Sequence, residues 1–408
     1  MSTDYEQIRK ICKERLLENL DYTRDISDEE IREFIDDCIL QIGRAGALSL
    51  QMKKRLQKEL FATIRQLDVL EEFLSDNSVT EIMVNGPNCI FIERKGRIQK
   101  VDAHFESIEK LSDVIQQIVA RVNRVVNEAS PIVDARLASG ARVHVVMPPV
   151  ALNGPILTIR RFPDHPMEEA DYYRLGSVNQ EIMGFIKKLI YAKYNIFISG
   201  GTGSGKTTFL NVLSGNIPAD ERIITIEDNA ELQIQNISNL VRLETRNANM
   251  EGCKPITIRD LIKASLRMRP DRIIVGEVRG EEAVDLLTAM NTGHDGSIST
   301  GHANSARDML TRLETMVLMG VEMPLEAIRR QIASAVDVII HLGRLRDHSR
   351  KLLEIVEVIG YDNHEIVLSP LYTFVEDGCT KEGKICGTFV KQNNMVHVQK
   401  LKAAGIEV

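Results

Sequence analysis

One segment constrains the fold of this chain more than any other: residues 200–207 read Gly-Gly-Thr-Gly-Ser-Gly-Lys-Thr. The apolar segment 196–198 before it has the composition of a buried strand, and residues 208–213 after it have the pattern of a helix. Strand, glycine loop and helix in this order form a phosphate-binding loop, because the glycines let successive backbone N–H groups point at phosphate oxygens. We therefore expect a nucleotide site within an α/β domain. A glycine-rich turn without a ligand is the plainer alternative, and the flanking strand and helix disfavour it.

The loop predicts a role for each of its residues. Lys206 should reach the β- and γ-phosphates, and the Thr207 hydroxyl should ligand Mg²⁺. The start of the helix adds its positive end to the phosphate site. ATP and Mg²⁺ are therefore the expected ligands. The expected nucleotide-binding residues are Gly201, Thr202, Gly203, Ser204, Gly205, Lys206, Thr207 and Thr208.

The composition narrows the class of protein. A chain of 408 residues with 43% hydrophobic and 27% charged residues is typical of a soluble protein of two or three domains. Its net charge of −7 disfavours a nucleic-acid-binding surface. Six cysteines without Cys-x-x-Cys spacing predict buried free thiols in a reducing compartment. No signal sequence and no apolar run of ~20 residues is found in the sequence, so we expect a cytoplasmic protein that reaches a membrane only through a partner.

The first part of the chain changes its period along its length. Residues 1–75 have helical spacing, with a stripe of leucine and isoleucine between residues 56 and 70. This stripe is interpreted as a packing face, with a partner-docking face as the alternative. Residues 76–162 predict a small α+β domain, in which short strands surround one long helix over residues 108–126.

The second part alternates strands and helices. A polar, proline-containing linker is expected at 163–174. From 175 to 408 the alternation predicts a parallel sheet covered on both faces. From about residue 350 the pattern changes to β-hairpins, which form a β-rich tail, with separate strands at 365–368 and 371–376.

Two carboxylates follow predicted strands of this sheet. Glu227 ends the strand that begins near residue 222, and Glu277 follows Ile273-Ile274-Val275-Gly276. In parallel α/β sheets, ligands bind at the carboxyl ends of the strands. We expect Glu277, with Thr207, to hold the metal and Glu227 to lie nearer the attacking water, although the sequence does not decide between the two glutamates.

Two histidines, His294 and His302, frame the next predicted strand. Metal binding is disfavoured because no cysteine and no third histidine lies near them in sequence. His302 follows a strand at the same sheet edge as the glutamates, and this position predicts a nucleotide-sensing or gating role for it.

Arginines are dense at the end of the small α+β domain, at Arg136, Arg142, Arg160 and Arg161. Arg142 and Arg161 are candidates for an arginine finger that reaches the γ-phosphate of a neighbouring subunit. The alternative is that these arginines are solvated or form salt bridges within their own domain.

Taken together, these motifs resemble the secretion traffic ATPase superfamily of type II and type IV systems. The resemblance rests on four motifs, the Walker A, Asp box, Walker B and His box, which here are residues 200–208, 225–228, 275–279 and 292–302. The segments 128–131, 139–142 and 159–162 are similar to the CpaF branch, which drives assembly of tight-adherence (Tad) pili. The similarity covers residues 75–345, so it leaves the first 75 residues and the tail without motifs.

The resemblance implies a RecA-like P-loop NTPase domain, preceded by the small α+β domain and the N-terminal helical segment. It also implies a homo-hexameric ring, with each active site between the two domains and near a neighbouring subunit. The atypical Walker B carboxylate, Glu277, is a feature of the superfamily.

The function implied is a cytoplasmic ATPase motor for pilus assembly or secretion. Its expected partner is an inner-membrane platform protein, which would hold it peripherally at the membrane, and no direct nucleic-acid contact is expected. Three alternatives stay open: a conjugation-type traffic ATPase for DNA or effector export, a RecA-like nucleic-acid motor, and a nucleotide-gated scaffold without turnover.

Overall fold

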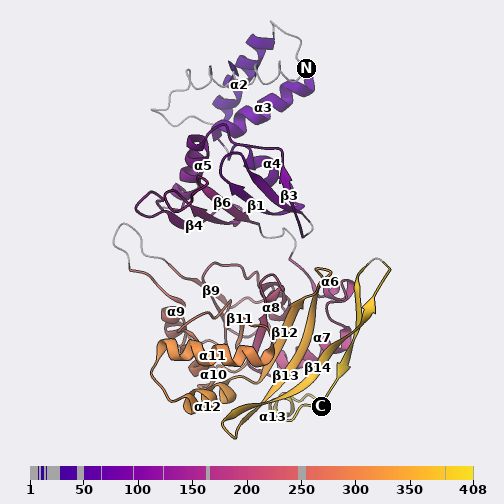
Figure 1. The fold of residues 1–408 in the computed structure, drawn as a ribbon. Helices are drawn as coiled ribbons and strands as arrows, with labels where there is room; N and C mark the ends of the chain where they lie inside the picture. The colour runs from indigo at the N-terminus through magenta and orange to yellow at the C-terminus, as the bar shows by residue number, and fades with distance from the viewer. Residues whose placement is uncertain are drawn as a thin grey trace. The chain divides into compact units, whose positions relative to one another are not determined.

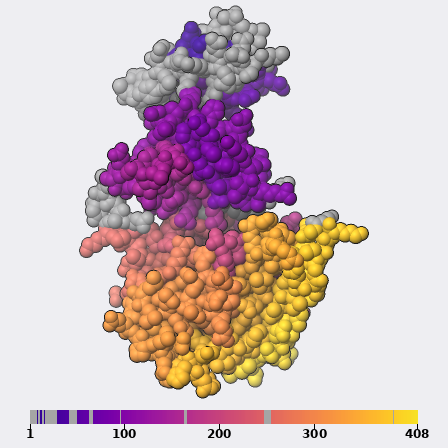
Figure 2. All heavy atoms as spheres, in the orientation of Figure 1, coloured from indigo at the N-terminus to yellow at the C-terminus, as the bar shows by residue number. Residues whose placement is uncertain are grey.

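The chain divides into two compact units, Met1–Asp164 and His165–Val408. Each unit is one continuous stretch of chain, as the colours show (Figure 1, Figure 2). A computed structural model describes residues 28–43, 50–65, 67–94, 96–122, 124–161, 166–246, 254–381 and 383–407, together with residues 8, 11, 12 and 15.

In the first unit, two helices pack against each other, α2 (Asp28–Gly43) and α3 (Leu50–Arg65). Their shared core contains Ile35 and Leu60, which are buried. The apolar stripe that was expected to continue to residue 70 is divided, because α3 ends first and Leu70 packs in the core of the following β-sheet. The single apolar stripe in the sequence therefore corresponds to two separate packing faces in the structure.

An antiparallel sheet forms the rest of the first unit. Within the described residues it has six strands in the order β3-β2-β1-β6-β5-β4. Helix α5 (Ile108–Ala120) packs on its buried face and begins at Ser107, whose side chain accepts a hydrogen bond from the Lys110 backbone N–H. The strands are β1 (Val79–Asn85), β2 (Ile90–Arg94), β3 (Arg97–Val101), β4 (Ile132–Arg136), β5 (Arg142–Val146) and β6 (Ile156–Arg160).

Two expectations for this unit were wrong. The long helix ends at Ala120 and does not continue to Val126, although Val126 is buried in the same core. Strand β4 was not expected at all, because its Ile-Val-Asp-Ala-Arg sequence alternates weakly. In the sheet, Val133 and Ala135 of β4 face the core.

The second unit is built on one large sheet. Within the described residues its nine strands have the order β15-β14-β13-β12-β7-β11-β10-β8-β9. In this order, the six neighbouring strands β12, β7, β11, β10, β8 and β9 are parallel to one another. They are β7 (Ile196–Gly200), β8 (Ile223–Glu227), β9 (Leu240–Glu244), β10 (Arg272–Val275), β11 (Ile298–His302) and β12 (Val338–Arg344).

Two apolar cores cover the two faces of this sheet, as a buried parallel sheet requires. Along β7, Phe197 packs in one core and Ile196 and Ile198 in the other. The helices that line these cores are α6 (Glu169–Arg174), α7 (Gln180–Tyr191), α8 (Lys206–Ser214), α9 (Ile258–Ser265), α10 (Ala283–Met290), α11 (Ala306–Gly320), α12 (Leu325–Ala335) and α13 (Gln399–Ala403).

The C-terminal tail differs from the expectation of separate hairpins. Strands β13 (Arg350–Asp362), β14 (Glu365–Cys379) and β15 (Ile385–Lys391) extend the main sheet beside β12 as antiparallel neighbours. The two short strands expected at 365–368 and 371–376 form the single strand β14, whose register to β13 shifts near Val356.

The segment expected as a linker is partly outside the described residues, because residues 162–165 are not among them. Residues 169–174 form α6, and its Tyr172 packs in a core of the second unit.

The cysteines are free where they are described, but they are not all buried as expected. Cys12 and Cys38 are buried, whereas Cys379 and Cys386 are exposed. Cys253 lies outside the described residues. Across the described part of the chain, no helix combines the length and the apolar character needed to span a bilayer.

Candidate nucleotide-binding site

The P-loop connects the central strand β7 to helix α8. All five residues of β7 are buried, so the strand fixes where the loop begins. Gly203 and Gly205 have φ values of +71° and +91°, which residues other than glycine rarely adopt. Gly205 is the N-cap of α8 and provides no side-chain cap, so the first N–H groups of the helix remain available to an anion.

Lys206 is the first residue of α8 and is almost fully buried. Its Nζ donates to the carbonyl oxygens of Gly200 (3.0 Å) and Gly201 (3.1 Å). It also lies 3.3 Å from Nδ1 of His302. Burial lowers the pKa of Lys206, and the nearby Glu277 carboxylate opposes that shift. The loop therefore holds a poorly solvated ammonium group, which would bind phosphate oxygens strongly.

Glu277 lies immediately beyond β10, beside His302 at the end of β11. One carboxylate oxygen is 2.9 Å from Nε2 of His302, and the other accepts a hydrogen bond of 2.7 Å from Arg279. Burial lowers the pKa of His302, while Glu277 opposes that shift. A row of three groups, Lys206, His302 and Glu277, thus runs from the P-loop to the strand end that resembles Walker B.

Glu227 ends β8 and is only 3% exposed. Its Oε1 accepts hydrogen bonds from the backbone N–H groups of Glu231 (2.9 Å) and Leu232 (2.8 Å). Its Oε2 is buried and has no hydrogen-bond partner among the described residues. Burial raises the pKa of Glu227 to about 7, although the two backbone hydrogen bonds oppose the shift. One oxygen is thus held in place, and the other is left to interact with a ligand or water.

The glycine that interrupts the Walker B-like sequence has a structural reason. A Cβ atom on Gly276 would lie 3.0 Å from Cγ of Glu227 on the neighbouring strand. Gly276 therefore makes room for the Glu227 side chain, and the two carboxylate motifs depend on each other. This dependence crosses between strands and is not visible in either motif alone.

A divalent metal could be held at the same edge. Among the described residues there is no group of three histidine, cysteine or acidic side chains arranged for a metal. Mg²⁺ does not need one, because it commonly takes one or two protein oxygens together with water and substrate phosphates. The hydroxyl of Thr207, second residue of α8, and the carboxylate of Glu277 are oxygen ligands of the right kind.

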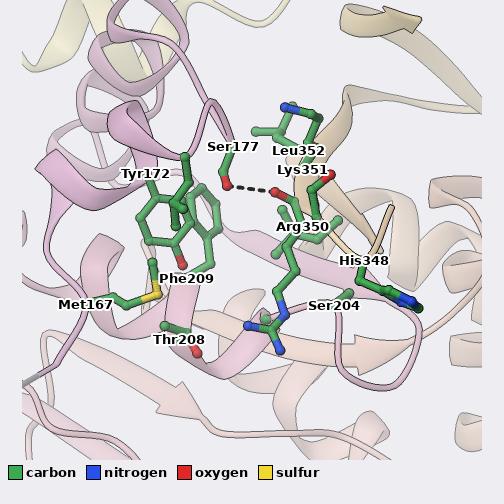
Figure 3. A pocket seen from close by; sticks show the side chains of 14 residues that line it. Met167, Tyr172, Ser177, Ser204, Thr208, Phe209, His348, Arg350, Lys351 and Leu352 are labelled. Carbon is green, nitrogen blue, oxygen red and sulfur yellow. Dashed lines mark hydrogen bonds between the residues drawn. The ribbon is translucent and has the colours of Figure 1, made fainter. Parts of the chain in front are cut away.

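Two cavities open beside the P-loop in the second unit. The first is polar, has a volume of about 460 Å³ and reaches from Gly201 and Thr202 past His302 to Arg312 of α11. The second is smaller, about 200 Å³, and is mostly apolar (Figure 3). Its lining residues include Met167, Tyr172, Leu175, Thr208, Phe209, Leu342, Arg350 and Leu352.

The apolar cavity brings distant parts of the chain to the P-loop. The rings of Tyr172 and Phe209 lie with centroids 5.3 Å apart. Arg350 comes from β13 and extends toward the P-loop helix (Figure 3). Its Nε donates to the Gly203 carbonyl at 2.9 Å, and its own carbonyl accepts a hydrogen bond from the Ser177 hydroxyl. No sequence pattern indicates Arg350, because 140 residues and more separate it from the loop that it contacts.

The candidate arginines of the first unit have two different environments. Arg142 on β5 is directly opposite Arg136 on β4 and Arg160 on β6, so three cations form a row across the sheet. Like charges directly opposite each other are destabilising. Asp134 compensates in part, with an oxygen 3.8 Å from Arg142.

Arg161, by contrast, is engaged within its own unit. Its guanidinium donates to the backbone carbonyls of Asp76 and Val79 and to the side chain of Asn77. These contacts hold the turn that leads into β1. Of the two arginines selected from sequence, Arg142 lies among other arginines beside Asp134, and Arg161 has the contacts of a structural residue.

Comparison with known proteins agrees with this geometry. The family described as "Type II/IV secretion system protein" matches residues 64–396. The conjugal transfer protein TrbB of Rhizobium radiobacter is 35% identical over 295 residues, which are 71% of this chain and 87% of that protein. The type IV secretion system protein VirB11 of Brucella suis is 33% identical over 305 residues, covering 68% of this chain and 84% of that protein.

A solved structure is similar in fold. The X-ray structure of the Legionella pneumophila ATPase DotB matches with a TM-score of 0.51 and 20% sequence identity, over 72% of this chain and 80% of that one. The fold class expected from the sequence, a RecA-like α/β domain preceded by a smaller domain, is confirmed.

Proposed function

Because the chain belongs to the type II/IV secretion system protein family, we propose that it is a motor that hydrolyses ATP with Mg²⁺ as a homo-hexamer. The row formed by Lys206, His302 and Glu277 beside the P-loop carries this proposal. An inert nucleotide-gated scaffold would have no need for a buried lysine, a histidine and a carboxylate in contact.

The two cavities suit the two ends of the nucleotide. The phosphates would bind the N–H groups of the P-loop, with Lys206 on the β- and γ-phosphates. The apolar cavity borders Thr208 and would take the base and ribose between Phe209 and Arg350. Mg²⁺ held by Thr207 and Glu277 would supply charge neutralisation at the phosphate oxygens.

Glu227 has the properties of a general base. A carboxylate whose pKa is about 7 can accept a proton from water near neutral pH. Its unpaired Oε2 is the atom to receive that proton. His302 lies between Lys206 and Glu277 and would report the state of the γ-phosphate to the loop that follows β11.

In the cell, we propose that this motor powers assembly of a Tad-type pilus, as the similarity of the segments 128–131 and 139–142 to the CpaF branch suggests. It would work in the cytoplasm at the inner face of the membrane, bound to an inner-membrane platform protein. A conjugation-type traffic ATPase is the second candidate, favoured by the 35% identity to a conjugal transfer protein. Loss of surface filaments in cells that carry Lys206→Ala would support the first, and loss of DNA transfer with intact filaments would support the second.

The test of the activity is ATP hydrolysis by the purified chain with and without Mg²⁺. Lys206→Ala should lower turnover by a factor on the order of 10² or more, because the charge on the β- and γ-phosphates is lost. Lys188→Ala, which removes an exposed lysine of α7, is the matched control and should hydrolyse normally. Equal rates for Lys206→Ala and wild type would show that the P-loop is not the hydrolytic site.

A further inference from the structure

A row of polar side chains that the roles above do not use lies beneath the P-loop. Ser199 of β7 is next to His341 of β12, and His341 is opposite Glu354 of β13. Ser199 and His341 are buried, and the Ser199 Oγ is 2.8 Å from the His341 Nδ1. Ser199 is fully buried, so the row is not a nucleophilic site. Buried polar groups are costly unless each is hydrogen-bonded, so the bonds of this row fix the geometry of their neighbours.

One end of the row fixes the entry to the P-loop. Ser199 directly precedes Gly200 and Gly201, whose carbonyl oxygens bind Lys206. The Ser199 side chain is therefore one residue away from the backbone that positions the lysine. A shift of Ser199 would move those carbonyl oxygens.

The other end fixes the loop that follows His302. The backbone of Asn304 interacts with the His341 ring and favours its protonated form. Glu354 Oε1 accepts the backbone N–H of Ala306 at 2.9 Å. Asn304 and Ala306 lie two and four residues after His302, where β11 leads into α11.

Burial favours a neutral imidazole at His341. Nδ1 shares a hydrogen bond with the Ser199 hydroxyl, in which the tautomer of the ring decides which group donates. Burial lowers the pKa of His341 and Lys206 adds to this effect, while Glu354 and Asp308 oppose it. A neutral ring ties the two segments together without adding charge beneath the phosphates.

We propose that His341 is a positioning residue for nucleotide hydrolysis: it ties the strand entering the P-loop to the loop after His302, and so keeps His302 between Lys206 and Glu277. The proposal rests on hydrolysis at the P-loop. His341 itself contacts neither of the residues assigned to the metal, so its effect would pass through Ser199 and Asn304.

The experiment compares three substitutions of His341 in the full-length, assembled chain. His341→Leu keeps about the same volume but removes the hydrogen bond to Ser199 and the polar interaction with the Asn304 backbone. It should lower kcat about tenfold or more because His302 is no longer held in register. The KM for ATP and the affinity for ADP should change less than about twofold, because phosphate binding is retained. The other two substitutions are His341→Asn, whose amide occupies the place of Nδ1, and His341→Gln, whose amide occupies the place of the other ring nitrogen. Each should recover part of the kcat that His341→Leu loses.

Ser199→Ala is a second, smaller change, with Ser265→Ala as its matched control. Ser265 is a buried serine of α9 that donates to a backbone carbonyl away from the site. Ser199→Ala should lower kcat and Ser265→Ala should not. A wild-type kcat in His341→Leu would overturn the positioning role alone. The same holds if His341→Asn and His341→Gln are as slow as His341→Leu and the loss of kcat in each variant follows its loss of Tm. No hydrolysis by wild type would overturn the proposed function as well.

Discussion

The two units place charged residues in opposite surroundings. In the second unit, Lys206 and Glu227 are buried at the ends of parallel strands, and burial shifts the pKa of both. In the first unit, Arg136, Arg142 and Arg160 stand in a row on the face of an antiparallel sheet that is turned away from its core.

This difference arises from the two kinds of sheet. A parallel sheet is covered on both faces, so polar groups at its carboxyl edge are held in low dielectric and by fixed partners. An antiparallel sheet can leave one face open to water, so charged side chains on that face are better solvated. We infer that the second unit contains the preorganised chemistry, and that the first unit supplies charge to a nucleotide bound elsewhere in a ring.

The largest expected effect tests this division. Arg142→Ala should lower turnover by a factor on the order of 10³ if the arginine stabilises charge on a neighbour's γ-phosphate. Arg161→Ala should instead lower the Tm, because its bonds to Asp76 and Val79 support the turn before β1. Activity should also rise with protein concentration as subunits associate.

Mixed rings show whether Arg142 acts on a neighbouring subunit. In an equal mixture of Lys206→Ala and Arg142→Ala subunits, about a quarter of the interfaces pair an intact P-loop with an intact arginine. Part of the activity should return in the mixture. A mixture that forms mixed rings yet stays as inactive as either parent would place Arg142 in its own subunit's chemistry or in none.

The next effect lies within the second unit. Glu227→Gln and Glu277→Gln are nearly isosteric and should each lower turnover by a factor on the order of 10², with ATP binding retained. Glu277→Gln should also raise the Mg²⁺ concentration needed for half-maximal turnover, whereas Glu227→Gln should not. Near-normal turnover in both variants would show that neither carboxylate is needed for hydrolysis, and reversed Mg²⁺ effects would exchange the two assignments.

The sequence predicts the centre of the second unit well, because local patterns determine it. A buried β-strand, a glycine loop and a helix place the P-loop residues. The strand ends at Glu227, Glu277 and His302 meet because neighbouring parallel strands end at one edge.

The pairing of strands that are distant in the chain could not be predicted from the sequence. Arg350, His341 and Glu354 lie on β12 and β13, and only the antiparallel extension of the sheet brings β13 beside the P-loop strands. The end of α5 was also hidden, because Val126 keeps an apolar character beyond the helix and packs in the same core. Periodicity reports that a residue is buried, and it does not report which element buries it.

The smallest effect is a pH dependence that only the buried unit should show. The pKa of Glu227 is raised to about 7, so the folded chain binds a proton that the unfolded chain has released above its ordinary pKa near 4.5. Protonation of Glu227 therefore stabilises the folded chain fully below about pH 4.5, and this contribution is lost as the pH rises towards 7. The free energy of unfolding should fall over the same range. Turnover should move the other way and rise by about tenfold from pH 6 to pH 8, as Glu227 ionises and becomes a base. Burial of this carboxylate therefore makes turnover rise with pH while the free energy of unfolding falls. Glu227→Gln should remove both trends, which a pH series of denaturant unfolding and steady-state hydrolysis would measure. If the rate of wild type is flat over this range while the variant has lost turnover, Glu227 acts by holding its loop through Glu231 and Leu232 and not by accepting a proton.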